Sequence, residues 1–269
     1  MQTSKVPAAS FADASKHRSS RMIRYAAVTD TGLVRKNNED SLYIGCPFGG
    51  IEDTLFIVAD GMGGHQGGEI ASRFVVQKIP ELLGKMKGRS DPFHFLEQVT
   101  EKTNAALYQL AQEKEELRGM GSTLVMAYFE EGIWHVINVG DSRAYYYIDG
   151  VLQQITKDHS LVEEMVEAGR LQRDDPLYRV NRNVITRAMG AEPYVEEDYF
   201  QIETAPGGRL LLCTDGLHGM VPDDLIAQVL EEEPDPDTAA VSLVQMARDA
   251  GGKDNITAIV ADCTEEDFV

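Results

Sequence analysis

Cysteine is scarce in this chain of 269 residues, where only Cys46, Cys213 and Cys263 occur. An odd count without a closely spaced pair fits neither a disulfide framework nor a zinc motif, so we expect a reducing, cytoplasmic setting. Long apolar runs are lacking too, because no stretch approaches the roughly 20 residues needed to span a membrane. The composition is that of a globular chain long enough to bury a core without cross-links.

Positive charge is also in deficit, with 25 Lys and Arg against 44 Asp and Glu and a formal net charge of -19. This field repels nucleic acid, and no basic stripe is present to offset it. Basic residues outnumber acidic ones near the start of the chain, a segment that lacks the apolar stretch of a secretory signal. We expect residues 1–20 to form a disordered tail and residues 21–266 to form one domain.

Hydrophobic spacing divides the rest of the chain into strands and helices. Helices are predicted over residues 69–83, 92–116, 160–168, 222–231 and 237–250, and residues 169–183 show no period. Ser160 followed by Glu163 forms a capping box for the third helix. Strands are predicted at 22–28, 41–44, 54–59, 123–129, 133–139, 143–148, 152–155, 199–202, 209–213 and 256–261. Strands grouped beside paired helices, without regular alternation, indicate an α+β layered domain.

Four aspartates stand at strand ends beside glycine or asparagine, namely Asp60, Asp141, Asp215 and Asp254. A single such pair has an ordinary explanation, since aspartate bonds its own backbone and glycine supplies positive φ. Four carboxylates at one edge of a core would repel each other unless cations lay between them. Oxygen ligands suit Mg²⁺ and Mn²⁺, and no histidine has zinc-site spacing. The pattern therefore predicts a magnesium or manganese site if these loops converge.

Other catalytic chemistries lack their motifs. A cysteine phosphatase needs an arginine six positions after its nucleophile, and Glu52, Gly219 and Val269 hold those positions here. No Gly-x-x-x-x-Gly-Lys-Ser/Thr loop is present for nucleotide phosphates, and no Gly-x-Ser-x-Gly elbow for a serine hydrolase.

Eight short blocks then occur in an order and spacing that resemble one family. They are residues 32–40 (GLVRKNNED), 58–65 (VADGMGGH), 121–123 (GST), 138–144 (NVGDSRA), 157–160 (KDHS), 185–190 (ITRAMG), 213–217 (CTDGL) and 254–257 (DNIT). Together they make the chain similar, from about residue 24 to 263, to the PPM family of Mg²⁺/Mn²⁺-dependent serine/threonine protein phosphatases in its compact bacterial form.

The resemblance implies a four-layer αββα sandwich of two stacked antiparallel sheets flanked by helix pairs, with a flap over about residues 160–183. It implies that Asp60 bridges two cations and that the carbonyl oxygen of Gly61 binds one of them. Asp215 and Asp254 would complete the second cation's ligands. Asp141, with Asp215, corresponds to a third and weaker site.

The resemblance also supplies neighbours for this site. Glu39 and Asp40 would hold metal-bound water, the usual role of groups behind a ligand shell. A water shared by two cations becomes hydroxide near neutral pH and attacks phosphorus. Arg35 would share the charge on the phosphoryl oxygens, and His65 would donate a proton to the departing oxygen. In the animal enzymes the histidine follows Asp-Gly directly, whereas residues 62–64 intervene here.

The function implied is hydrolysis of phosphoserine and phosphothreonine in proteins, with a protein kinase and its substrates as partners. We expect a monomer in the cytoplasm that binds no membrane. Two other interpretations stay open: a phosphatase dedicated to one phosphorylated anti-sigma-factor antagonist, and a phosphoprotein-binding regulator without activity. A nucleotide-directed two-metal hydrolase is disfavoured by the charge and the order of the blocks.

Overall fold

The computed structural model of the protein describes residues 23–48, 54–64, 66–86 and 91–263. The tail expected at residues 1–20 lies outside this part of the chain. The described residues contain eleven strands and eight helical segments, joined by turns and loops.

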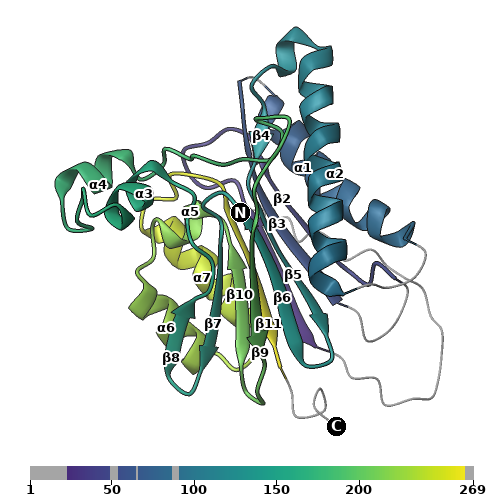
Figure 1. The fold of residues 1–269 in the computed structure, drawn as a ribbon. Coiled ribbons are helices and arrows are strands. Elements are labelled where there is room, and N and C mark those ends of the chain that lie inside the picture. The colour runs from purple at the N-terminus through teal and green to yellow at the C-terminus, as the bar shows by residue number, and fades with distance from the viewer. Residues whose placement is uncertain (1–22, 49–53, 65, 87–90, 264–269) are drawn as a thin grey trace.

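The strands form two antiparallel sheets (Figure 1). The first sheet has the order β1 (Arg24–Asp30), β11 (Ile256–Asp262), β10 (Arg209–Cys213), β7 (Arg143–Ile148) and β8 (Val151–Gln154). The second has the order β2 (Asp40–Gly45), β3 (Thr54–Met62), β5 (Leu124–Glu130), β6 (Ile133–Val139) and β9 (Asp198–Glu203), with β4 (Gly121–Ser122) paired to β3.

Strand β3 shows why the sheets stack, because its side chains are apolar on both faces. Phe56 and Val58 enter a cluster with Trp134 and with residues of β10 and β11, so they fill the space between the sheets. The alternate residues Leu55 and Ile57 enter a second cluster with two helices. A period of two places successive side chains on opposite faces, so a strand apolar at every position lies between two apolar layers.

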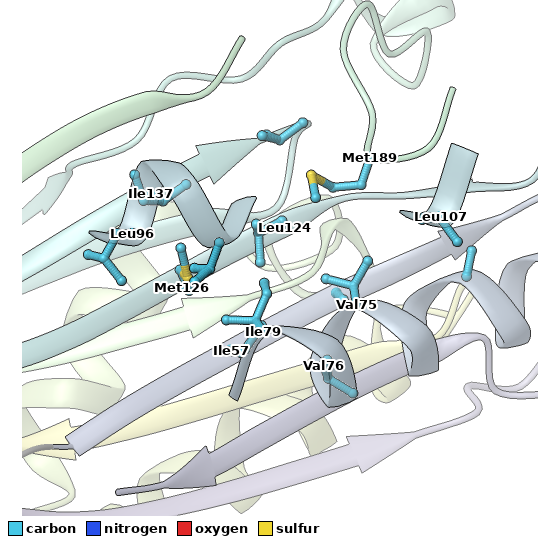
Figure 2. Close-up of a cluster of buried hydrophobic side chains, with 14 of the residues drawn as sticks. Ile57, Val75, Val76, Ile79, Leu96, Leu107, Leu124, Met126, Ile137 and Met189 are labelled. Carbon is cyan, nitrogen blue, oxygen red and sulfur yellow. The ribbon is translucent and has the colours of Figure 1, made fainter. Parts of the chain in front are cut away.

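Helix pairs cover the outer faces of the sheets. The helical segments are α1 (Gly67–Gly84), α2 (Pro92–Glu113), the 3₁₀ turn η1 (Glu115–Leu117), α3 (Leu161–Glu167), α4 (Pro176–Asn181), α5 (Asp215–His218), α6 (Asp223–Glu232) and α7 (Pro236–Asp249). Figure 2 shows Ile57 and Met126 of the second sheet beside Val75 and Ile79 of α1. Helices α6 and α7 pack in the same way on the first sheet. The order helix, sheet, sheet, helix is the αββα sandwich expected from the resemblance.

The predicted elements are present, with differences at short segments. Helix α2 stops at Glu113 and the last predicted turn is the separate η1. Helices α4 and α5 were not predicted, because segments of six and four residues are too short to show a helical period.

The predicted capping box of α3 is only half formed. The Ser160 hydroxyl accepts from the Glu163 N–H at 3.4 Å, as expected. The Glu163 carboxylate, however, accepts from Arg173 at 2.8 Å and from the Tyr178 hydroxyl. Glu163 therefore holds the flap segment together instead of returning to the helix N-terminus.

No helix within the described ranges combines the length and apolarity required to cross a membrane.

Trp134 offers a test of the core between the sheets, because it is fully buried and its ring lies 4.8 Å from that of Phe129 and 5.5 Å from that of Phe56. We expect Trp134→Ala to lower the free energy of unfolding by about 3–5 kcal/mol, since the cavity cannot close fully. Urea unfolding followed by far-ultraviolet circular dichroism measures this change, because that signal does not depend on the tryptophan that the substitution removes. Tyr194→Ala, at a side chain 88% exposed, is the control and should stay within about 0.5 kcal/mol. A loss below 1 kcal/mol for Trp134→Ala would contradict this packing.

Candidate metal centre

The strand registers bring the four aspartates to one end of the sandwich. Asp60, near the end of β3, pairs across the ladder with Asp40 at the start of β2. Asp141 lies in the turn between β6 and β7, and Asp215 opens α5 directly after β10. Asp254 lies two positions before the start of β11. Because neighbouring strands are antiparallel, the ends of β3, β6 and β10 and the starts of β2, β7 and β11 share this edge.

The main chain at Asp60 is held from three sides. Its N–H donates to the Thr123 hydroxyl at 2.8 Å, and its carbonyl oxygen accepts from the Thr123 N–H at 2.8 Å. The Ser122 hydroxyl also donates to this carbonyl at 3.0 Å. The next N–H, of Gly61, donates to the Glu39 carbonyl at 3.1 Å. The Asp60 side chain therefore projects from a fixed backbone.

Glycine follows Asp60 and Asp215 for a reason other than the positive φ expected from the sequence. A Cβ at Gly61 would lie 2.0 Å from the carbonyl oxygen of Gly68 in α1, and a Cβ at Gly216 would lie 1.9 Å from that of Asn255. Neither glycine adopts positive φ. The requirement at both positions is close approach of two backbones, which brings a helix or a loop against each aspartate.

Two histidines hold the turn that carries Asp141. The Gly140 N–H donates to Nδ1 of His159 at 3.1 Å, and the His159 N–H donates back to the Gly140 carbonyl at 2.9 Å. Nε2 of His159 lies 3.2 Å from the Asp198 carboxylate and so carries the ring proton. On the other side, Nε2 of His218 donates to the Asp141 carbonyl at 2.9 Å. Neither histidine was given a role from the sequence.

Asn255 joins Asp254 to the loop between β1 and β2. Its side-chain oxygen accepts from the Glu39 N–H at 2.8 Å, and its amide nitrogen donates to the carbonyls of Thr31 and Asn37 at 3.0 and 2.9 Å. Its own N–H donates to Asp254 Oδ1 at 2.9 Å. Both polar groups of this buried side chain are hydrogen-bonded to the loop between β1 and β2. Asn255, which the sequence suggests is a turn residue, therefore links two segments of the fold.

Arg35 reaches the cluster from the same loop. Its Nη2 donates to Asp254 Oδ2 at 2.8 Å, while the side chain as a whole stays 51% exposed. The bond with Asp254 is the main cause of a raised pKa for Arg35, and the charges of Asp60 and Glu39 add to it. The guanidinium thus lies among the carboxylates with part of its fork open to solvent.

Four buried aspartates at this edge, Asp40, Asp60, Asp141 and Asp215, share one electrostatic property, a raised pKa. Burial is the largest cause in each case, and the negative charges of the neighbours add to it. The pKa of Asp215 rises to about 6, opposed by Arg182 and Arg35, and that of Asp141 rises to about 8. The pKa of Asp60 is raised well above its usual range, with Asp40 the largest charged contributor. The fold therefore holds carboxylates together against their own repulsion.

Unpaired oxygens mark this edge as a place for a cation. Asp40 Oδ1 and Asp215 Oδ1 are buried and have no hydrogen-bond partner. Buried polar atoms normally have hydrogen-bond partners. For an unpaired carboxylate oxygen, a hard cation and its bound water can serve as those partners. Within the described ranges, no group of three or more His, Cys, Asp or Glu side chains is arranged to hold an ion as it stands. Asp254 is paired with Arg35. The oxygen donors at this edge fit the ligand chemistry of Mg²⁺ or Mn²⁺.

The remaining predicted site residues divide into two cases. Glu39 lies at this edge, and burial is the first cause of its raised pKa. His65 lies outside the described residues. The flap also contributes a residue, because Arg182 donates to the Gly219 carbonyl at 3.1 Å beside α5, whereas Arg173 is paired with Glu163.

Comparison with known proteins gives a consistent set of relatives. Residues 36–260 match the family described as Protein phosphatase 2C. The chain is 37% identical over 247 residues to the serine/threonine protein phosphatase PstP of Mycobacterium tuberculosis, covering 92% of this chain and 46% of that protein, so it spans about half the length of this relative. It is 33% identical over 242 residues to the serine/threonine phosphatase stp of Listeria innocua, covering 87% of this chain and 93% of that protein. The crystal structure of the PstP catalytic domain in complex with two manganese ions superposes with a TM-score of 0.79 at 36% identity, covering 90% of this chain and 99% of that one.

The raised pKa values predict how pH affects stability without metal. A carboxyl whose pKa is higher in the folded than in the unfolded chain stabilises the fold while protonated, and this contribution is lost as pH rises through the folded pKa. Burial and the charge of Asp215 raise the pKa of Asp141 to about 8, well above the usual range of an aspartate. We therefore expect the melting temperature in EDTA to fall between pH 7 and 8.5.

Two comparisons control this measurement. Saturating Mn²⁺ should abolish most of the fall, because the cation replaces the protons. Asp141→Asn in EDTA should melt higher than the natural protein at pH 8.5, because one buried charge is gone. A melting temperature in EDTA that stays constant or rises over this pH range would show that repulsion among the carboxylates does not destabilise the fold.

Proposed function

Because the chain belongs to the protein phosphatase 2C family, the PPM phosphatases, we propose that it hydrolyses phosphoserine and phosphothreonine in proteins, using Mn²⁺ or Mg²⁺. The observation that carries the proposal is the convergence of Asp60, Asp141, Asp215 and Asp254 with Arg35 at one end of the sandwich. Partners would be a serine/threonine protein kinase and its substrates, in the cytoplasm. The relatives' names and the low cysteine content support these parts of the proposal.

The cations are assigned by the oxygen donors. Asp60 would bridge two of them, with the carbonyl oxygen of Gly61 on one and Asp215 and Asp254 on the other. Asp141, which neighbours Asp215 electrostatically, would help to hold a third. Bound there, the cations would supply a water whose pKa lies near neutral, as attack on phosphorus requires.

Arg35 would bind the substrate phosphate. One nitrogen of its fork contacts Asp254, and the exposed remainder can donate to two phosphoryl oxygens in one plane. Phosphate oxygens would also offer an alternative acceptor to this arginine, so that Asp254 can turn toward a cation. His65 is proposed as the proton donor to the departing serine or threonine oxygen.

The flap would contact the peptide around the phosphorylated residue. Leu177 and Val180 are exposed on α4, at 57% and 78%, and Arg182 connects the end of this segment to the loop after α5. An apolar and basic surface beside the cluster suits a phosphopeptide better than a free phosphate. Exchanging residues 160–183 for those of a relative should therefore change the order of preference among phosphopeptides.

Phosphate release from a phosphothreonine peptide tests the proposal. With Mn²⁺ we expect turnover, with EDTA none, and with Asp215→Asn a loss of more than about 100-fold, because loss of a ligand exceeds the 10–100-fold typical of groups behind it. Asp237→Asn is the matched control, since this exposed aspartate lies in the first turn of α7, away from the cluster. It should keep full activity.

The same assay separates the other interpretations. Binding of phosphopeptide without release, in protein shown to hold Mn²⁺, would indicate a phosphoprotein-binding regulator. Release from one phosphoprotein but from no peptide or aryl phosphate would indicate a dedicated regulatory phosphatase. Equal activity in EDTA would contradict the metal-dependent proposal altogether.

A further inference from the structure

Buried hydrogen bonds surround Asp40 and involve strands of both sheets. Its Oδ2 accepts from the Thr257 hydroxyl at 2.7 Å and from the Thr214 hydroxyl at 2.9 Å. Thr214, directly after β10, and Thr257, near the start of β11, are fully buried, and their hydroxyls reach from one sheet to a carboxylate on the other. Behind them lie Thr29 of β1 and Asn38 of the loop before β2.

The direction of each bond follows from counting hydrogens. A hydroxyl has one hydrogen, and Thr214 and Thr257 both spend theirs on Asp40. The Thr214 oxygen therefore acts as acceptor to its other neighbour, the Thr257 N–H at 3.0 Å. The Thr257 oxygen, 2.8 Å from the Thr29 oxygen, accepts from that hydroxyl in turn.

The far end of the chain of bonds is fixed as well. Thr29 accepts from the Asn38 side-chain nitrogen at 2.8 Å, and the Asn38 side-chain oxygen accepts from the Asp40 N–H at 3.1 Å. That second bond settles which way the amide points. An amide nitrogen and a backbone N–H can only donate, so the bonds from Asn38 through Thr29 and Thr257 run in one direction and end on Asp40 Oδ2.

The other oxygen of Asp40 is left without a hydrogen-bond partner. This Oδ1 is buried, and Asp40 lies directly across the ladder from Asp60. Since Oδ2 is occupied by two hydroxyls, Oδ1 is the only oxygen of the carboxylate available to another donor.

We propose that Thr214 and Thr257, backed by Thr29 and Asn38, are positioning residues that fix Asp40 so that its Oδ1 accepts from water on the cation bound by Asp60. This rests on the proposed function. The resemblance assigned a water-holding role to Asp40 itself but gave none to the threonines. Hydrogen bonds of this kind behind a ligand shell normally set metal affinity as well as activity.

Thr257→Val and Thr257→Ser separate this role from simple packing. Valine keeps the volume and removes the hydroxyl, while serine keeps the hydroxyl and removes a methyl group. The control is Thr103→Val in α2, because Thr103 is equally buried and its hydroxyl has no hydrogen-bond partner. Circular dichroism and melting temperature establish that each variant is folded.

The primary readout is the Mn²⁺ dissociation constant of the tightest site by isothermal titration calorimetry, and the second is kcat and KM on a phosphothreonine peptide. We expect Thr257→Val to weaken Mn²⁺ binding roughly 10-fold and to lower kcat more than it changes KM. Thr257→Ser should recover binding to within about 3-fold, and Thr103→Val should match the natural protein. If Thr257→Val does not fold, Thr29→Val, one bond further from the carboxylate, should weaken binding by about 3-fold.

The two proposals fail in different ways. A natural protein that binds Mn²⁺ but releases no phosphate would overturn the proposed function and leave the calorimetric comparison to decide on the threonines. Folded valine variants that bind Mn²⁺ like the natural protein would overturn the threonine proposal. A serine variant as impaired as the valine variant would also overturn it, because the methyl group would then be the cause.

Discussion

Repulsion among carboxylates is the constraint on which the rest of this structure depends. Asp40, Asp60, Asp141 and Asp215 all have raised pKa values because burial and one another's charge disfavour ionisation. Such a group does not assemble by itself, so the surrounding fold must hold each member in place. The sandwich supplies the required rigidity, since the core between its sheets fixes the strand ends from which these residues project. The packing between the sheets therefore determines both the stability of the fold and the placement of the carboxylates at its end.

The fold meets this constraint with contacts that cross between elements. Asn255 joins the loop before β11 to the loop before β2, and Thr214 and Thr257 join the first sheet to Asp40 on the second. Gly61 and Gly216 allow the backbones to meet closely enough for these bonds. Arg35 forms an ion pair with Asp254 beside this group and stays half exposed. This arrangement leaves selected oxygens unpaired, which is what a site for divalent cations in the protein phosphatase 2C family requires.

Much of this could be predicted from the sequence, and the parts that could not have a common cause. The double-sided apolar pattern of residues 54–59 predicts a strand between two layers, and the aspartates at strand ends predict an oxygen-rich site. Local signals of this kind depend on neighbours in the sequence. The bonds from Asp40 to Thr214 and Thr257 join residues 174 and 217 positions apart, so no local pattern predicts them. The glycines after Asp60 and Asp215 were misinterpreted for the same reason, because the backbone that approaches each of them comes from elsewhere in the chain.

Locating the cations themselves is the most direct test of this metal site. Crystals of the protein grown with Mn²⁺ would be measured for anomalous scattering at the manganese edge. We predict two strong peaks bridged by the Asp60 carboxylate, one beside the Gly61 carbonyl oxygen and the other beside Asp215 and Asp254. Asp254 would then be turned away from Arg35. Manganese bound elsewhere, with Asp254 still paired to Arg35 and no peak at Asp60, would contradict this prediction.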